Sequence, residues 1–157
     1  MAAPVLTVVD TRDTPVSSWD NGVVQASQES SVLTIIIWNN RGNEVSVSDL
    51  KDASITALDI DGRAVTEVVA DKWVRVNVPA MDNSENVWVP IGGSTVRMLR
   101  ADGLNESAGY TIKGSSNDGL IANSSENYCV VRLKTVVPSG VSAGIRDYKL
   151  SIRGYFV

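Results

Sequence analysis

Few side chains in this chain could perform acid–base or nucleophilic chemistry. The chain has no histidine and a single cysteine, Cys129, so a serine–histidine or cysteine–histidine pair cannot form. A zinc site needs several thiols or imidazoles and is excluded for the same reason. Carboxylates remain, and a facing pair of them is the arrangement used by glycoside hydrolases. The spacing of the glutamates brings no two of them together: Glu29, Glu44, Glu67, Glu85, Glu106 and Glu126. We therefore expect no enzyme activity and no cofactor.

Motifs that bind ions or phosphates are also incomplete. The segment 59–62 reads Asp-Ile-Asp-Gly and is similar to the start of a calcium loop, but no glutamate follows at the required position. The glycine-rich segments 92–93 and 114–119 lack the lysine and the following helix of a phosphate loop. We interpret all three segments as turns.

Charge and hydropathy exclude two further classes of partner. The net charge is -4 and no block of Lys and Arg occurs, so we expect no nucleic-acid partner. The longest apolar run, near Val32–Trp38, is far shorter than the ~20 residues that a membrane helix needs. Residues 1–10 lack the charged start and long apolar core of a signal peptide, and Cys129 lies in an apolar run as a small buried residue. These features predict folding in a cytosol without disulfides.

Alternation of apolar and polar residues predicts the elements that carry these side chains. In the run 145–157, Tyr148, Leu150, Ile152 and Phe156 fall on one face. This run and 128–137 are joined by a Pro- and Gly-containing connection, so we expect a terminal hairpin. The run Val32–Asn39 is apolar on both faces, which predicts a central strand covered on both sides, either by the chain itself or by a partner molecule.

Together these patterns predict one all-β domain over residues 1–157. Turn residues interrupt the strands at short intervals and no helical periodicity stands out, which is typical of an antiparallel β-sandwich of about seven to nine strands. Residues 1–15 are expected to include an extended segment that is able to add a strand to a neighbour's sheet.

Candidate binding residues are apolar or aromatic positions expected at the surface. In the run 72–78 three valines alternate with Trp73 and Arg75, so we expect Trp73 and Arg75 to face outward. Tryptophan is enriched at the energetic centres of protein interfaces. The further candidates are Val5, Leu6, Val8 and Trp19. Two kinds of contact stay open for Trp73, a protein interface and a platform for a sugar ring.

Two stretches carry a resemblance at the level of the fold. Residues 17–24 read Ser-Ser-Trp-Asp-Asn-Gly-Val-Val and lead into a strand that ends in Asn-Asn-Arg-Gly, and residues 137–148 place Pro and Ala-Gly before a final strand. Both resemble the opening and closing parts of immunoglobulin-like sandwiches. The all-β character, acidic charge and Asn-, Ser- and Gly-rich loops are also similar to small structural proteins of tailed-bacteriophage particles.

This resemblance implies a structural component of a virion that is assembled in the host cytoplasm. The implied role is a decoration protein that binds the major capsid protein or other virion subunits, with homo-oligomers expected. Two alternatives stay open: a tail or baseplate accessory protein, and a carbohydrate-binding or adhesion module.

Overall fold

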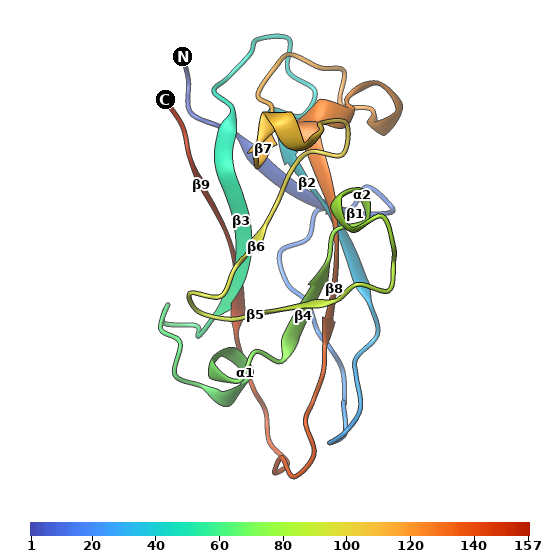
Figure 1. Cartoon of the computed structure of the whole chain (residues 1–157), viewed down its shortest axis with the longest axis vertical. Helices are drawn as coiled ribbons and strands as arrows, with labels where there is room; N and C mark the ends of the chain where they lie inside the picture. Colours follow the sequence, from blue (N-terminus) through green and yellow to red (C-terminus); the bar gives the residue numbers. More distant parts are fainter.

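The computed structural model describes all 157 residues, and most of its regular elements are β-strands (Figure 1). The strands are β1 (Leu6–Asp10), β2 (Leu33–Asn39), β3 (Leu50–Leu58), β4 (Val74–Asn77), β5 (Val89–Ile91), β6 (Arg97–Met98), β7 (Thr111–Ile112), β8 (Tyr128–Thr135) and β9 (Lys149–Tyr155). The helical segments are short: α1 (Glu67–Ala70), α2 (Pro79–Asp82) and the 3₁₀ turns η1 (Glu106–Ala108), η2 (Ile121–Asn123) and η3 (Ser125–Asn127).

The strands form two antiparallel sheets, so the prediction of an all-β sandwich is confirmed. The larger sheet has the order β1-β2-β8-β4-β5. In the smaller sheet β3 is central and pairs with β6, β7 and β9. In Figure 1 the smaller sheet lies on the left, and β5 and β6 approach each other at the front.

A core of 20 buried residues fills the space between the sheets. Ile37 of β2, Ile55 of β3 and Leu133 of β8 are all completely buried in it. Burial of a side chain of this size stabilises the folded state by about 1.5–3 kcal/mol. The core therefore supplies the main force that holds the two sheets face to face.

β2 is apolar on both faces because the chain covers both. Ile35 and Ile37 face the main core, whereas Ile36 and Trp38 belong to a second cluster on the outer face of the larger sheet. β2 lies between β1 and β8, so the prediction of an interior strand is confirmed. On that outer face it is the chain, rather than a partner, that covers Ile36 and Trp38.

The cover over this second cluster comes from loops. The Arg41 guanidinium lies 4.9 Å from the centre of the Trp38 ring, and the Tyr128 hydroxyl donates to the carbonyl of Ile121 at 3.3 Å. Asn117 donates to the Asn40 carbonyl at 2.9 Å and so ties the long 114–127 loop to the end of β2. Side-chain amides thus replace regular pairing as the support of this loop.

The predicted terminal hairpin is wrong. β8 pairs with β2 and β4 in the larger sheet, whereas β9 pairs with β3 in the smaller one. The connection 138–148 therefore crosses from one sheet to the other at the lower end of the molecule (Figure 1). Of the expected inward face of the last run, Tyr148, Leu150 and Ile152 pack against the core, but Phe156 lies beyond the strand and is 52% exposed.

The N-terminal segment belongs to the chain's own sheet. β1 pairs with β2 over its whole length. Residues 14–16 then fold back, so that Asp10 donates its N–H to Thr14 and Val16 donates to Val8. The extended segment predicted within residues 1–15 is present, but its strand is already paired.

One buried ion pair links the two sheets. Asp82 follows β4 of the larger sheet, and Arg97 belongs to β6 of the smaller sheet; Nη2 of Arg97 lies 2.8 Å from Oδ1 of Asp82. Both side chains are largely buried, and Oδ2 of Asp82 also accepts from the N–H of Val78 at 2.9 Å. The carboxylate is thus satisfied on both oxygens, as a buried charge requires.

The segment 59–62 is a turn, as predicted. Gly62 has φ of 87° and donates its N–H to the carbonyl of Asp59. The Thr66 hydroxyl donates to the Asp59 carboxylate, and this bond is the main reason that the pKa of Asp59 is lowered. The carboxylate therefore organises the entry into α1.

Candidate interaction site

One edge of the smaller sheet is open along a whole strand. At Ser54 and Ile55, β3 has β6 on one side and β9 on the other, and at Lys51 it has β7 on one side and β9 on the other. β6 and β7 therefore share one edge of β3, and β9 occupies the opposite edge. No other strand pairs with β9, so its outer side faces away from the sheet.

The direction of the backbone groups shows which amides are free. The carbonyls of Ala53 and Ala57 accept bonds from Leu99 and Gly93 on the β6 side, so residues 54, 56 and 58 of β3 face β9. Their partners in β9 are residues 153, 151 and 149. The alternate residues Leu150, Ile152 and Gly154 consequently direct their N–H and C=O groups outward, where this chain supplies no partner.

The other sheet edges are covered or interrupted. Residues 14–16 lie along the outer side of β1. β5 carries Pro90, which has no N–H to offer. β6 and β7 are two residues each, and β6 lies beside β5. An unpaired strand edge is a template for pairing with another chain, and β9 is the edge of this molecule that offers one.

The two faces of β9 differ in chemistry. Leu150 and Ile152 are half-buried and pack against the main core. Lys149, Arg153 and Tyr155 are exposed on the outer face. β9 continues into two further exposed apolar residues, Phe156 and Val157.

Close packing fixes the register of β9 on β3. A Cβ added to Gly154 would lie 2.6 Å from Cδ1 of Leu50 and 2.8 Å from the Lys51 carbonyl oxygen. β3 has an irregularity between Lys51 and Ser54 at this point. Glycine is therefore required where the two backbones approach each other around the irregularity.

A large apolar cleft lies beside the inner face of β9. Its volume is about 1200 Å³, and Leu150 and Ile152 contribute to its wall. Two irregular segments, 16–26 and 141–148, also line it. Across it Trp19 and Tyr148 meet edge to face, with ring centres 6.2 Å apart. Burial raises the pKa of Tyr148, whose hydroxyl accepts from Asn21 at 2.8 Å.

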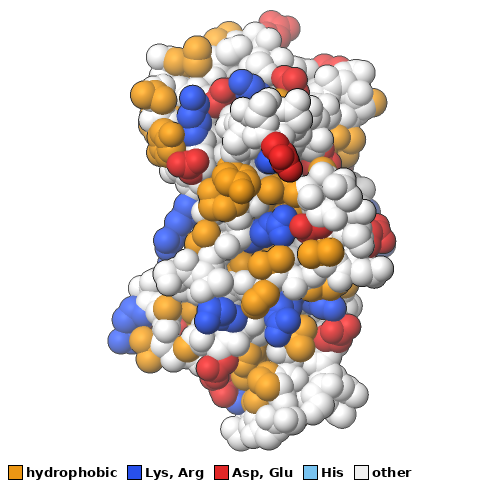
Figure 2. Space-filling model, viewed as in Figure 1, with side chains coloured by type: hydrophobic (Ala, Val, Ile, Leu, Met, Phe, Trp, Pro, Cys, Tyr) orange, Lys and Arg blue, Asp and Glu red, His pale blue; other side chains and the backbone are white.

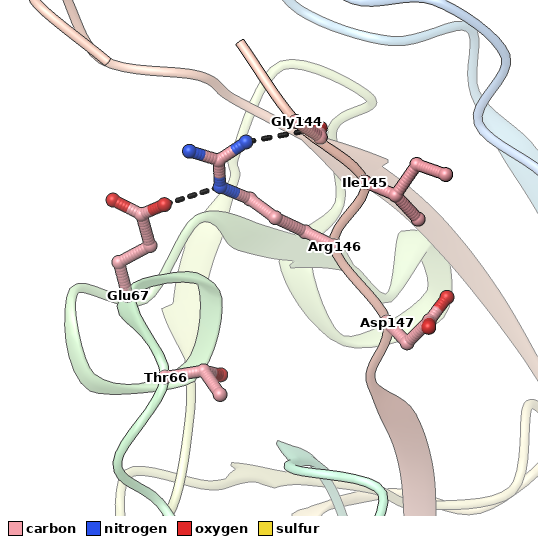
Figure 3. A pocket seen from close by; sticks show the side chains of 6 residues that line it. All are labelled: Thr66, Glu67, Gly144, Ile145, Arg146 and Asp147. Carbon is pink, nitrogen blue, oxygen red and sulfur yellow. Dashed lines mark hydrogen bonds and ion pairs between the residues drawn. The ribbon is translucent and has the colours of Figure 1, made fainter. Parts of the chain in front are cut away.

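Arg146 fixes the connection that covers this end of the sandwich. Figure 3 shows its guanidinium bonded both to Glu67 of α1 and to the carbonyl of Gly144 in its own segment. The same guanidinium lies 5.5 Å from the centre of the Trp73 ring. Charge pairing and ring contact together hold 141–148 against α1.

The expected exposure of Trp73 is wrong. Trp73 is 4% exposed and belongs to the main core, and its indole N–H makes no hydrogen bond. The reason is the turn that precedes β4: Lys72 has φ of 55°, and Trp73 donates its N–H to Val68. Strand alternation cannot be counted back through that turn. Arg75 does lie within β4, but it is half-buried and its Nε atom is buried without a partner.

The other predicted binding residues are spread over the molecule. Val5 and Leu6 are 48% and 40% exposed at the start of β1. Val8 and Trp19 are instead partly buried and pack against the main core. The structure brings Val8 and Trp19 to the same cleft, and it brings neither of them together with Arg75.

Basic and hydrophobic side chains also alternate elsewhere on the surface. Figure 2 shows Lys and Arg interleaved with hydrophobic side chains across the middle of one face. At Trp88 this contact is direct, because Lys134 Nζ lies 4.3 Å and the Arg132 guanidinium 5.2 Å from the ring centre. Trp88 is half-buried under these cations.

Sequence reasoning missed β9 as an open edge. The alternation of Lys149 and Arg153 with Leu150 and Ile152 gave the correct faces of the strand. The assumed hairpin, however, paired β8 and β9 with each other, whereas in the structure β8 pairs with β2 and β4, and β9 pairs only with β3. The length of the connection 138–148 was the signal against a tight hairpin.

The sequence matches no protein-family model and no curated protein. None of the helices is both long enough and apolar enough to span a membrane. No three Cys, Asp or Glu side chains are grouped so that they could hold a metal ion.

Proposed function

We propose that this chain is a non-enzymatic structural subunit that works by binding neighbouring protein subunits through the open edge of β9. The observation that carries the proposal is the row of outward backbone groups at Leu150, Ile152 and Gly154, which this chain leaves without partners. Addition of a strand to such an edge gives affinity through main-chain hydrogen bonds, and side chains on either face give specificity.

The role proposed for this binding is that of a decoration protein on a bacteriophage capsid. Support comes from the two-sheet scaffold and from the resemblance of the sequence to small virion proteins. A subunit that binds only the assembled lattice stabilises that lattice by mass action. A tail or baseplate position in the virion is the alternative, and the same edge would serve there.

The surface around β9 can supply the area that a stable contact needs. A stable interface buries about 1,200–2,000 Å² in total. Besides the strand edge, exposed apolar side chains continue from β9 into the residues that follow it: Tyr155, Phe156 and Val157. A partner strand along β9 together with contacts to these side chains would form one continuous surface.

The virion role is tested on bacteriophage particles purified from a culture that produces this chain. We expect mass spectrometry to find the chain as a stoichiometric component of purified particles, and cryo-electron microscopy to place it on the capsid exterior. Density on the tail would favour the alternative position. Particles that lack the chain altogether would refute a virion role.

The edge itself is tested with a matched pair of variants. Ile152→Pro removes an outward N–H without removing a bond to β3, whereas Ile152→Ala removes the same side-chain packing and keeps the N–H. We expect the proline variant to bind particles about tenfold more weakly than the alanine variant, because one main-chain hydrogen bond to the partner is lost and its acceptor is left unpaired. Equal binding by the two variants would show that the partner does not pair with β9.

A further inference from the structure

The outer face beside the open edge is basic, although the chain as a whole is acidic. Lys149 and Arg153 of β9 and Lys51 of β3 are exposed there, and Lys51 lies directly opposite Tyr155 on the same face. None of the six ion pairs of the chain includes any of these three cations. The net charge of -4 makes this unpaired basic stripe unusual for the molecule.

We infer that the segment which pairs with β9 is an extended strand with acidic side chains on its outer face and apolar side chains on its inner face. This inference rests on the proposed function, because it specifies the partner of the same edge. Side chains directly opposite each other in neighbouring strands interact, and opposite charges there are favourable. Carboxylates opposite Lys149 and Arg153 would complete the charge pairing that the chain lacks.

The register of β9 fixes the order of side chains in the partner. Lys149 and Arg153 are separated by Ser151 on the outer face, with Leu150 and Ile152 facing inward between them. The partner strand should therefore read acidic, apolar, polar, apolar, acidic. Its two apolar side chains would lie beside Leu150 and Ile152, which already form part of the wall of the large cleft.

A second copy of this chain is a poorer occupant of the edge. Antiparallel pairing of β9 with itself about Ile152 would place each Arg153 opposite a Ser151 and diagonal to the partner's Lys149 and Arg153. Four cations would then lie on one face with no carboxylate of β9 among them. Like charges at such positions destabilise this register, whereas a different, acidic strand would pair these cations.

The test uses a capped synthetic peptide, Ser-Thr-Glu-Val-Thr-Val-Glu-Thr-Ser, added to the full chain labelled with ¹⁵N. This sequence reads the same in both directions, so it serves for either strand polarity. We expect the amide resonances of Leu150, Ile152 and Gly154 to shift. The affinity should be about tenfold higher than for the peptide with Lys in place of Glu, and salt should reduce this difference.

The double variant Lys149→Glu with Arg153→Glu provides the matched control. Both side chains are exposed, so the fold should be retained, and the preference should change to the lysine peptide. Equal binding of both peptides at β9 would refute the acidic partner and leave the proposed edge pairing intact. Concentration-dependent shifts of the same amides without peptide would refute it in favour of a second copy.

If no peptide shifts these amides and Ile152→Pro binds particles as well as Ile152→Ala, both the acidic partner and the open-edge site are wrong.

Discussion

Replacement of Trp73 by alanine distinguishes a buried tryptophan from an exposed one. The side chain is 4% exposed and lies within the core of 20 residues, so Trp73→Ala leaves a cavity between the sheets. Such a substitution costs about 3–5 kcal/mol, a large part of the roughly 5–15 kcal/mol by which proteins are stable. At ~2–4 °C per kcal/mol for a chain of this size, Tm should fall by about 6–20 °C.

The details of the Trp73 site predict a smaller effect for phenylalanine. The indole N–H makes no hydrogen bond, so Trp73→Phe loses ring volume but no polar contact. The aromatic face under the Arg146 guanidinium is also kept. We expect Trp73→Phe to cost about 1–2 kcal/mol, well below the cost of alanine.

The measurement is urea unfolding followed by far-UV circular dichroism, because each variant removes one of the four tryptophans and so alters the fluorescence signal itself. Trp88→Ala is the control: Trp88 is half-buried on the outer face under Arg132 and Lys134, and its loss should cost less than that of Trp73. A cost for Trp73→Ala within about 0.5 kcal/mol of zero would be typical of a surface position and would refute the buried placement.

Four further predictions concern single positions. Asp82→Ala should destabilise the fold by about 3–5 kcal/mol in urea unfolding, because it leaves the largely buried Arg97 without its carboxylate; a cost under about 1 kcal/mol would contradict the buried pair. Gly154→Ala should lower Tm and speed hydrogen exchange in β9, since its Cβ would overlap Leu50; unchanged exchange would contradict the close packing. Burial raises the pKa of the Cys129 thiol, so a thiol reagent at pH 8 should react only after unfolding, and rapid labelling of the native protein would contradict its burial. Burial also raises the pKa of Asp102 above 3.8. The contribution of this group to stability should therefore be fully present at pH below 3.8 and be lost as the pH rises through the higher pKa of the folded state. Asp102→Asn should remove that loss, and a pH profile of stability identical to that of the unchanged chain would contradict the prediction.

Alternation within a strand was the part of the sequence that translated directly into structure. It identified the two apolar faces of β2 and the inner side chains Leu150 and Ile152 of β9, because side-chain direction in a strand depends only on parity. It failed at Trp73, where the left-handed residue Lys72 breaks the parity. A single residue at positive φ is a local feature that the pattern of apolar residues does not predict.

Strand pairing was less accessible than strand location. Residues 67–70 form the short helix α1, which no helical periodicity predicted, and its entry is fixed by the hydrogen bonds that Val65 N–H and the Thr66 hydroxyl donate to the Asp59 carboxylate. The partners of β8 and β9 depend on which of the two sheets buries the apolar side chains of each strand. That choice is made by the whole core, so the open edge of β9 could not be found from the last thirty residues alone.

The central position of β8 has a consequence for synthesis on the ribosome. β2 pairs with a strand that lies roughly a hundred residues later in the chain, and at ~5–20 residues per second the wait between the two is about 5–20 s. During that time the run of isoleucines at 35–37 is translated but lacks its neighbour. The nascent polypeptide should therefore depend on chaperones until its last quarter emerges.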